Sequence, residues 1–201
     1  MPKKFSQRAD DLRRALAQEA ARVMAQQGIE DFLQAKRKAA ERLGIDDAAV
    51  LPKNTEIEAA LRDYQRLFGG SSHDETLKAM RRTALAAMQM LREFQPRLVG
   101  PVLAGTATGH SEIDLHVFAE PAESVALKLM DFGVPHELHE RRVRMDAERT
   151  LNVPSLRFSS EQWMVDAMVF PVDGIRQAPY SPVDGRPMKR ADAREVLELI
   201  S

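Results

Sequence analysis

The sequence contains no cysteine, no long apolar run and almost no net charge, and each absence excludes a class of protein. Without cysteine, neither a disulfide framework nor a thiolate metal site can form, which is in keeping with a reducing cytoplasm. No stretch approaches the roughly 20 apolar residues that a membrane-spanning helix requires. Residues 1–12 are basic but have no apolar segment behind them, which argues against a secretion signal. We therefore expect a cytoplasmic protein with no membrane partner.

The charge of the chain is balanced, with 29 lysines and arginines against 30 aspartates and glutamates. Bulk electrostatics therefore do not indicate a nucleic-acid-binding protein, and any site for a polyanion must be local. Hydrophobic residues make up 44% of the 201 positions, which is ordinary for a globular chain that can bury a core. This length allows one large domain or two small ones.

The first part of the chain has the pattern of helices that each bury one face, because apolar residues recur every three or four positions. Asn54 or Thr55 is expected to cap the third helix, and glycines or Pro96 to end the helices. The run Gly69-Gly70-Ser71-Ser72 is the best candidate for a hinge, since it offers little side-chain packing. We therefore predict a helical domain over 1–72 and a second domain over 73–201. The predicted helices are 6–28, 30–43, 54–68 and 73–94.

Beyond Pro96 the pattern changes to short β-branched or alternating runs separated by turn residues, which indicates strands. We predict helices over 122–132 and 191–200 among these strands. The predicted class is therefore α+β, a mixed β-sheet packed with helices and preceded by an all-helical N-terminal unit. The predicted strands are 98–104, 112–118, 136–143, 155–158 and 162–170.

Acidic side chains gather on one face of the predicted strand 112–118. Side chains alternate along a strand, so Glu112, Asp114 and His116 share the face opposite the apolar residues between them. Adjacent carboxylates repel unless a cation lies between them, and magnesium suits such a site. A third acid, Asp166, interrupts an apolar strand, where burial without a partner is costly. The alternatives are a solvated polar face and, for Asp166, pairing with an arginine such as Arg157.

These motifs resemble those of the DNA polymerase β-like nucleotidyltransferase superfamily, particularly its minimal bacterial members. In that family a strand ends in Gly-Ser or Gly-Gly, a short helical turn follows, the next strand carries Ser-Asp-hydrophobic-Asp-hydrophobic, and a later strand carries a third acid. This chain offers Leu103–Thr106, Ser111–Leu115 and Val165–Ala167 for the three parts. By element order, the resemblance covers roughly Thr76 to the C-terminus.

The resemblance implies a nucleotidyltransferase-like sheet and an enzyme that moves a nucleoside monophosphate from a triphosphate to a hydroxyl acceptor, with release of pyrophosphate. The acceptor could be a nucleic acid, a protein or a small molecule. Mg²⁺ or Mn²⁺ is the implied cofactor. The implied catalytic and metal-binding residues are Glu112, Asp114 and Asp166, and the implied nucleotide-binding residues are Gly105, Thr106 and Ser111.

The chain departs from the family pattern at three points. Thr106 replaces Ser or Gly, Glu112 replaces the commoner Asp, and only residues 107–111 separate Thr106 from Glu112, fewer than the family usually has. A shortened phosphate-binding turn favours an alternative, a catalytically inactive nucleotidyltransferase fold that serves as a binding module or an antitoxin-like regulator.

Other polar groups have simpler interpretations. His116 is expected to be a hydrogen-bonded structural histidine, and segment 136–144 an exposed, charged edge strand rather than a zinc site. Arg141, Arg142 and Arg144 in this segment could supply positive charge to a triphosphate. The N-terminal helical unit could cover the active site, recognise the acceptor or mediate homodimerisation.

Overall fold

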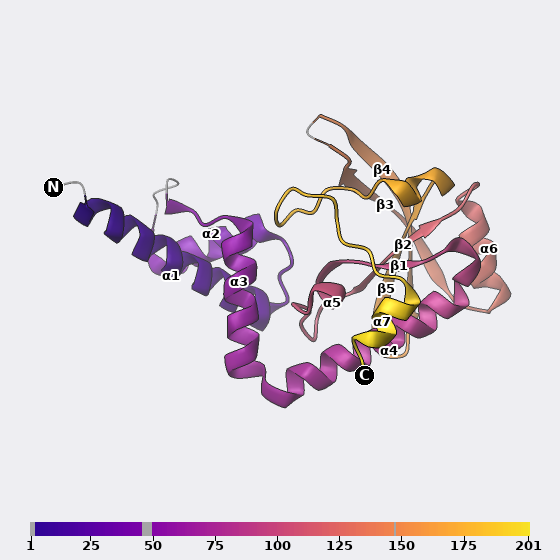
Figure 1. The fold of residues 1–201 in the computed structure, drawn as a ribbon, viewed down its shortest axis with the longest axis horizontal. Helices are drawn as coiled ribbons and strands as arrows, with labels where there is room; N and C mark the ends of the chain where they lie inside the picture. The colour runs from indigo at the N-terminus through magenta and orange to yellow at the C-terminus, as the bar shows by residue number, and fades with distance from the viewer. Residues whose placement is uncertain (1–2, 46–49, 147) are drawn as a thin grey trace. The chain divides into compact units, whose positions relative to one another are not determined.

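The computed structural model describes residues 3–45, 50–146 and 148–201, which form two compact units (Figure 1). The first unit contains the described residues up to Asp74, together with Thr108–His110 and Pro182–Asp184. The second contains Glu75–Ala107, Ser111–Ser181 and Gly185–Ser201. Among the described residues, every helix is too short or too polar to traverse a lipid bilayer.

The first unit is helical, as predicted, and has a core of its own. Leu16 and Ala20 of the first helix pack with Ala39 of the second and Ile57 of the third, all fully buried. Asp31 caps the second helix by accepting a hydrogen bond from the Gln34 amide at 2.6 Å, so this helix starts later than predicted. The helices are α1 (Lys3–Gln27), α2 (Phe32–Leu43), α3 (Asn54–Tyr64) and the π-helical turn η2 (Gln65–Gly69).

The predicted cap of α3 is wrong, because the cap residue is Lys53. The Lys53 backbone N–H donates to the Glu56 carboxylate at 2.6 Å, which satisfies an amide at the start of the helix. The Asn54 side chain instead donates to the Pro182 carbonyl at 2.7 Å, within the same unit.

The segment predicted as a hinge is helical except at one residue. Helix α4 (Gly70–Met90) begins three residues before the predicted start at His73. Gly70 has a φ of +50° and a ψ of −148°, which lie outside the helical region. Ser71 and Ser72 continue the helix, so the lack of side-chain packing did not prevent helix formation.

The second unit is built on a mixed sheet, which confirms the α+β class. Its strands lie in the order β1-β2-β5-β4-β3, so the longest exposed edge belongs to β3, as predicted for segment 136–144. Strands β2 and β5 are parallel, and the other neighbours are antiparallel. In the described part of the chain the strands are β1 (Arg97–Leu98), β2 (Ile113–Phe118), β3 (His136–Arg144), β4 (Thr150–Ser160) and β5 (Trp163–Phe170).

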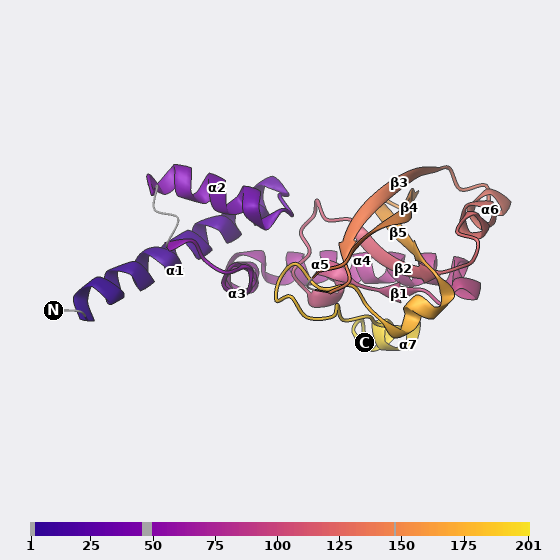
Figure 2. The same ribbon diagram turned by 90° about the horizontal axis from the view of Figure 1, so that it is seen from above.

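The helices of this unit contribute to the core on one face of the sheet. Ile113, Leu115 and Val117 of β2 pack there with Met80 of α4 and Leu129 of α6. Figure 2 shows α4 running along the sheet. The opposite face carries a smaller apolar cluster that includes Phe118 and Phe170, and Ile175 of the 3₁₀ helix η4 packs against it. The remaining elements are η3 (Arg92–Phe94), α5 (Gly100–Ala104), α6 (Glu123–Asp131), η4 (Val172–Arg176) and α7 (Ala193–Glu198).

The strand predicted over 98–104 is wrong. Strand β1 ends at Leu98, and Gly100–Ala104 forms helix α5. Pro101 suits the first turn of a helix, because its missing N–H would have no helical partner there, and the same lack disfavours a strand. Gly100 turns the chain between the two elements with a φ of +68°, which favours glycine.

Candidate functional site

The three acids singled out in the sequence lie on the same side of the sheet. Asp114 of β2 and Asp166 of β5 are direct partners on neighbouring parallel strands, so their side chains lie on the same face. The two strand backbones are about 5 Å apart. Glu112 lies immediately before β2. Side chains alternate along β2, so this face is opposite the one that Ile113 and Leu115 pack against the helices.

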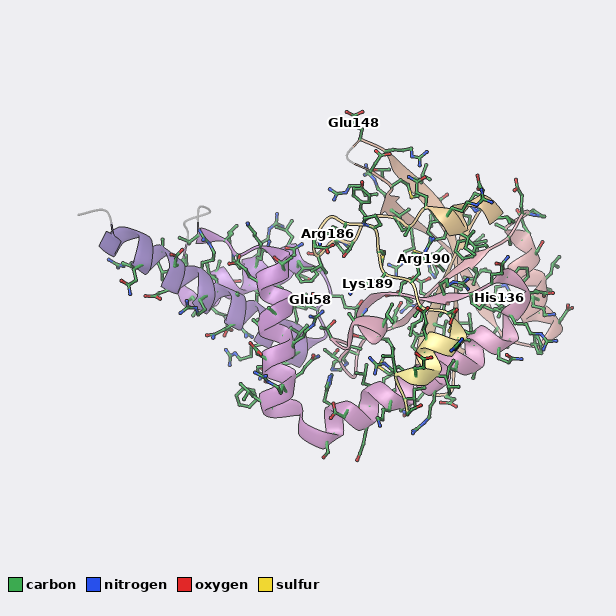
Figure 3. All side chains as sticks on the ribbon, viewed as in Figure 1. Glu58, His136, Glu148, Arg186, Lys189 and Arg190 are labelled. Carbon is green, nitrogen blue, oxygen red and sulfur yellow. The ribbon has the colours of Figure 1, made fainter. Side chains whose placement is uncertain are left out.

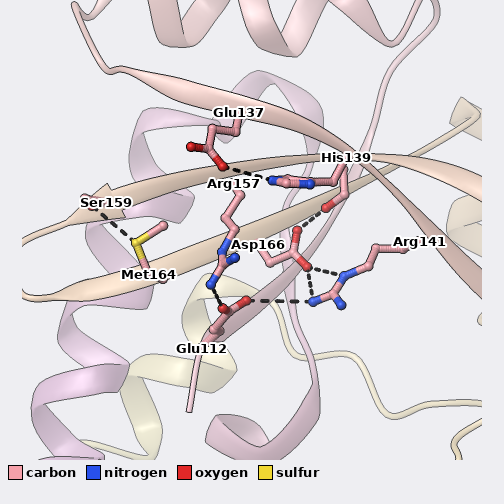
Figure 4. A network of polar contacts seen from close by, with 9 residues as sticks. Glu112, Glu137, His139, Arg141, Arg157, Ser159, Met164 and Asp166 are labelled. Atoms are coloured by element: carbon pink, nitrogen blue, oxygen red, sulfur yellow. Dashed lines mark hydrogen bonds and ion pairs between the residues drawn. The ribbon is translucent and has the colours of Figure 1, made fainter. Parts of the chain in front are cut away.

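Asp166 is buried, with an exposed fraction of 2%, and both of its carboxylate oxygens accept hydrogen bonds (Figure 4). Ser155 of β4 donates to Oδ1. Arg141 of β3 reaches Oδ2 with Nε at 2.6 Å and Nη2 at 2.5 Å. A buried carboxylate requires such partners, and here they come from both strands that follow β5 in the sheet.

Glu112 joins this network through two arginines. Arg157 donates to its Oε1, and Arg141 Nη2 lies 3.7 Å from its Oε2 (Figure 4). Arg141 therefore lies between Glu112 and Asp166. An arginine partner for Asp166 was one of the alternatives from the sequence, with Arg157 as the example. The partner is Arg141, although Arg157 is opposite Asp166 in the strand register.

The acids outweigh the effect of burial on the pKa of Arg141. Burial alone would lower the pKa of Arg141, but the charge and hydrogen bond of Asp166, followed by the charges of Asp114 and Glu112, outweigh it and raise the pKa. The three carboxylates and two guanidiniums thus form one ionic network, which we call the acidic network: Glu112, Asp114, Asp166, Arg141 and Arg157.

Gly100 is a residue of this site that the sequence analysis missed. A Cβ at Gly100 would collide with Oδ2 of Asp114, so the backbone approaches this carboxylate more closely than any other residue type permits. The adjacent Val99 N–H donates to the Asp114 carbonyl at 3.0 Å. The signal was the Gly-Pro pair ahead of a short apolar run, a pattern typical of a helix start.

Two of the residues predicted to bind nucleotide, Gly105 and Thr106, lie at the end of α5, and the third, Ser111, lies shortly before β2. Gly105 is the C-cap of α5 with a φ of +80°, and the Gly105 and Thr106 amides donate to the Pro101 carbonyl, the latter at 2.9 Å. Thr106 and Ser111 are both buried. Because these amides already have an acceptor, the structure gives no support to a phosphate-binding role, and that role stays a prediction.

His116 is a structural histidine, as the sequence suggested. It is fully buried, and Arg190 Nε donates to its Nδ1 at 3.0 Å, which places the ring proton on Nε2. Burial and then the charge of Arg190 lower the pKa of His116 to about 3. Arg190, labelled in Figure 3, also donates to the carbonyls of Gly174 and Ile175. Within the described residues, His116 Nε2 and Arg190 Nη2 have no hydrogen-bond partner.

The donor set of the acidic network suits Mg²⁺ or Mn²⁺, because these ions prefer carboxylate oxygens. Across residues 3–45, 50–146 and 148–201, no three acidic, histidine or cysteine side chains are grouped to hold a metal as they stand. The guanidinium of Arg141 lies between Glu112 and Asp166, and its side chain is 49% exposed.

Comparison of the chain with models of known protein families, with curated proteins and with solved structures found no match.

Proposed function

We propose that this chain is a metal-dependent nucleotidyltransferase that moves a nucleoside monophosphate from a nucleoside triphosphate to a hydroxyl acceptor and releases pyrophosphate. The observation that carries the proposal is the convergence of Glu112, Asp114 and Asp166 on one face of the sheet. Asp166 comes from a part of the chain separate from Glu112 and Asp114, and its placement on the opposite face would have excluded a shared metal site.

The element order around Gly100 supports the resemblance to the polymerase β-like superfamily. Strand β1 leads to Gly100, helix α5 follows, and Ser111 and Glu112 then precede the acidic strand β2. We propose that Gly100, rather than Gly105, takes the place of the family's glycine. Residues 102–111 would then separate the glycine turn from Glu112, and the turn would not be shortened. Pro101 stands where the family has Ser or Gly.

The three acids and Arg141 each have a role in this proposal. Glu112, Asp114 and Asp166 would hold Mg²⁺, and Asp166 would also accept the proton of the attacking hydroxyl. Bound Mg²⁺ would supply charge neutralisation at the phosphates. Arg141, released from Asp166, would bind the phosphates through charge-assisted hydrogen bonds.

A second function follows if the hydrogen bonds of Asp166 and of the Gly105 and Thr106 amides are never released. Both oxygens of Asp166 have partners, and the Gly105 and Thr106 amides are bound to Pro101. In that case the acidic network is a structural ionic cluster, and the chain is a non-catalytic binding module or an antitoxin-like regulator.

The test is calorimetric titration of the protein with ATP, GTP, CTP and UTP in Mg²⁺, followed by pyrophosphate release with RNA or the protein itself as acceptor. We expect Mg²⁺-dependent binding that EDTA abolishes, and loss of turnover in Asp114→Asn and Asp166→Asn. Glu140→Gln, on β3 beside Arg141 but exposed, is the matched control and should leave turnover unchanged. Trp163 fluorescence checks that each variant is folded.

Two results would count against the enzyme. The absence of heat with all four triphosphates would favour the binding module. Full turnover in both aspartate variants would show that the acids do not carry the chemistry.

A further inference from the structure

A second site with a different charge lies at the β1 edge of the sheet. It is a pocket of about 380 Å³ between the end of α4, the η3–β1 turn and the start of α7. The pocket is open to solvent rather than enclosed, so it suits one group of a ligand, with the rest of the ligand in solvent. None of its lining residues belongs to the acidic network, so the two sites have separate binding groups.

The pocket has an excess of positive charge. Arg92, Arg97 and Arg194 line it, and Asp192 is the one acid among the lining residues in the described part of the chain. The Asp192 carboxylate is engaged in accepting the Glu195 amide at 3.0 Å as the cap of α7. Arg194 is 88% exposed and its Nε lies 3.5 Å from the Glu198 carboxylate, so the excess positive charge of the pocket comes from Arg92 and Arg97.

Arg97 is held in place without an acidic partner. Its Nη1 donates to the carbonyls of Gln95 and Pro96, both at 3.0 Å, so two backbone bonds fix the guanidinium. Within the described residues, neither Arg92 nor Arg97 forms an ion pair with a carboxylate. The charge of Arg97 is felt beyond the pocket, since burial and then Arg97 lower the pKa of Arg190 to about 10.

Gln95 ends the 3₁₀ helix η3 and lines the pocket. It is the C-cap of η3, with a φ of +47°, and its N–H donates to the Arg92 carbonyl at 3.2 Å. Its side chain is exposed, and with Gln89 it adds a carboxamide to the pocket.

We propose that this pocket binds the phosphate of a small phosphorylated molecule, such as a sugar phosphate or a nucleoside monophosphate. The planar guanidiniums of Arg92 and Arg97 match the oxygens of a phosphate, which they bind in forked pairs of hydrogen bonds. Ala193 provides exposed apolar surface beside the two arginines for the organic part of the ligand. The proposal does not depend on nucleotidyl transfer.

Calorimetric titration of the full chain tests the pocket, with ribose 5-phosphate, AMP, inorganic phosphate and ribose as probes. All titrations are made in EDTA, so the acidic network cannot bind phosphate through a metal. We expect the two phosphate esters to bind, inorganic phosphate to bind more weakly, and ribose not to bind. Arg97→Gln and Arg92→Gln should each raise the Kd about tenfold, because each removes a charge-assisted contact.

The matched control is Arg82→Gln, which removes the same charge from an exposed position of α4 outside the pocket and should leave the Kd unchanged. Failure of both esters to bind would overturn the proposal, as would equal weakening by Arg82→Gln. Tighter binding of a single-stranded oligonucleotide than of AMP, with a steep dependence on salt, would also overturn it in favour of a nucleic-acid surface. The Asp166→Asn variant should bind ribose 5-phosphate with the same Kd as the unmodified chain. Binding at the pocket is therefore tested separately from the proposed nucleotidyl transfer.

Discussion

At the scale of single residues, Asp166 and His116 are two buried polar groups of the second unit that each have an arginine as partner. Arg141 donates to the Asp166 carboxylate directly. Arg190 binds the neutral form of His116, because its Nε–H needs an acceptor and a protonated imidazole has none. Folding therefore stabilises the uncharged ring of His116.

The buried His116 predicts a loss of stability in mild acid. Its folded pKa of about 3 lies below the value of about 6.5 expected in the unfolded chain, so between these values the unfolded state binds more protons. Its contribution is complete above pH 6.5 and is lost as the pH falls toward 3. Lowering the pH from 7.5 to 5.0 should lower the free energy of unfolding by about 2 kcal/mol through this residue.

Urea unfolding in EDTA, followed by Trp163 fluorescence, measures this effect. In His116→Asn an amide oxygen can accept the Arg190 hydrogen bond without titrating, so the variant should lack that part of the pH dependence. Equal losses of stability in the variant and the unmodified chain would show that His116 does not titrate as inferred.

The close approach of Gly100 to Asp114 predicts an effect beyond that of backbone conformation. Gly100→Ala should cost about 1 kcal/mol for a left-handed φ plus the cost of displacing the Asp114 carboxylate. Gly133→Ala is the control, since Gly133 has a φ of +66° in the same unit and no described atom lies within 4 Å of a Cβ there. Urea unfolding should show a larger loss for Gly100→Ala.

The contact itself is tested by combining Gly100→Ala with Asp114→Ala. Removing the carboxylate should restore part of the lost stability, which a double-mutant cycle would report as a coupling between the two positions. Additive losses would mean that the alanine at 100 does not meet Asp114.

At the scale of elements, the sequence predicted the helices and strands that depend on local patterns of apolar and polar residues. The helices of the first unit and strands β2, β3 and β5 follow from periodicity, and the alternation along β2 correctly placed Asp114 opposite the core. The strand predicted over Leu98–Ala104 was wrong because the prediction relied on β-branched and apolar residues. Gly100 and Pro101 in the same run mark a turn and a helix start. Arg141 could not be foreseen as the partner of Asp166, because this contact crosses β4 and depends on the strand order.

The N-cap of helix α2 makes a contribution to stability that can be measured. Asp31 accepts the Gln34 amide at 2.6 Å, so Asp31→Ala should lower the stability of the first unit by about 1 kcal/mol, measured as far-UV circular dichroism in urea. Asp10→Ala removes an equal charge from an exposed pair with Arg13 on α1 and should cost much less. Similar losses in the two variants would assign the effect to charge rather than to the cap.

At the scale of the whole molecule, the two units have separate hydrophobic cores. The first is formed by α1, α2 and α3, and the second by the sheet and the helices that pack on it. The single tryptophan, Trp163, lies in β5 of the second unit. Fluorescence therefore reports on the second unit, whereas circular dichroism at helical wavelengths reports on both.

Leu16→Ala should lower the stability of the first unit alone. Leu16 is fully buried in the first core, and its truncation removes about 2–5 kcal/mol of packing. On heating, a helical transition should move to lower temperature while the Trp163 transition stays in place. A common shift of both signals would show that the units unfold as one cooperative body.

The arginines of the acidic network also determine how a metal ion could enter it. Three carboxylates against two guanidiniums leave one unit of negative charge, so a bare divalent ion would meet a region already close to electroneutrality. A triphosphate that binds together with the ion would give the Arg141 guanidinium a phosphate partner in place of the Asp166 carboxylate. Under the proposed function, ion and nucleotide would therefore be taken up cooperatively, and the resting protein would use Arg141 as its built-in counterion.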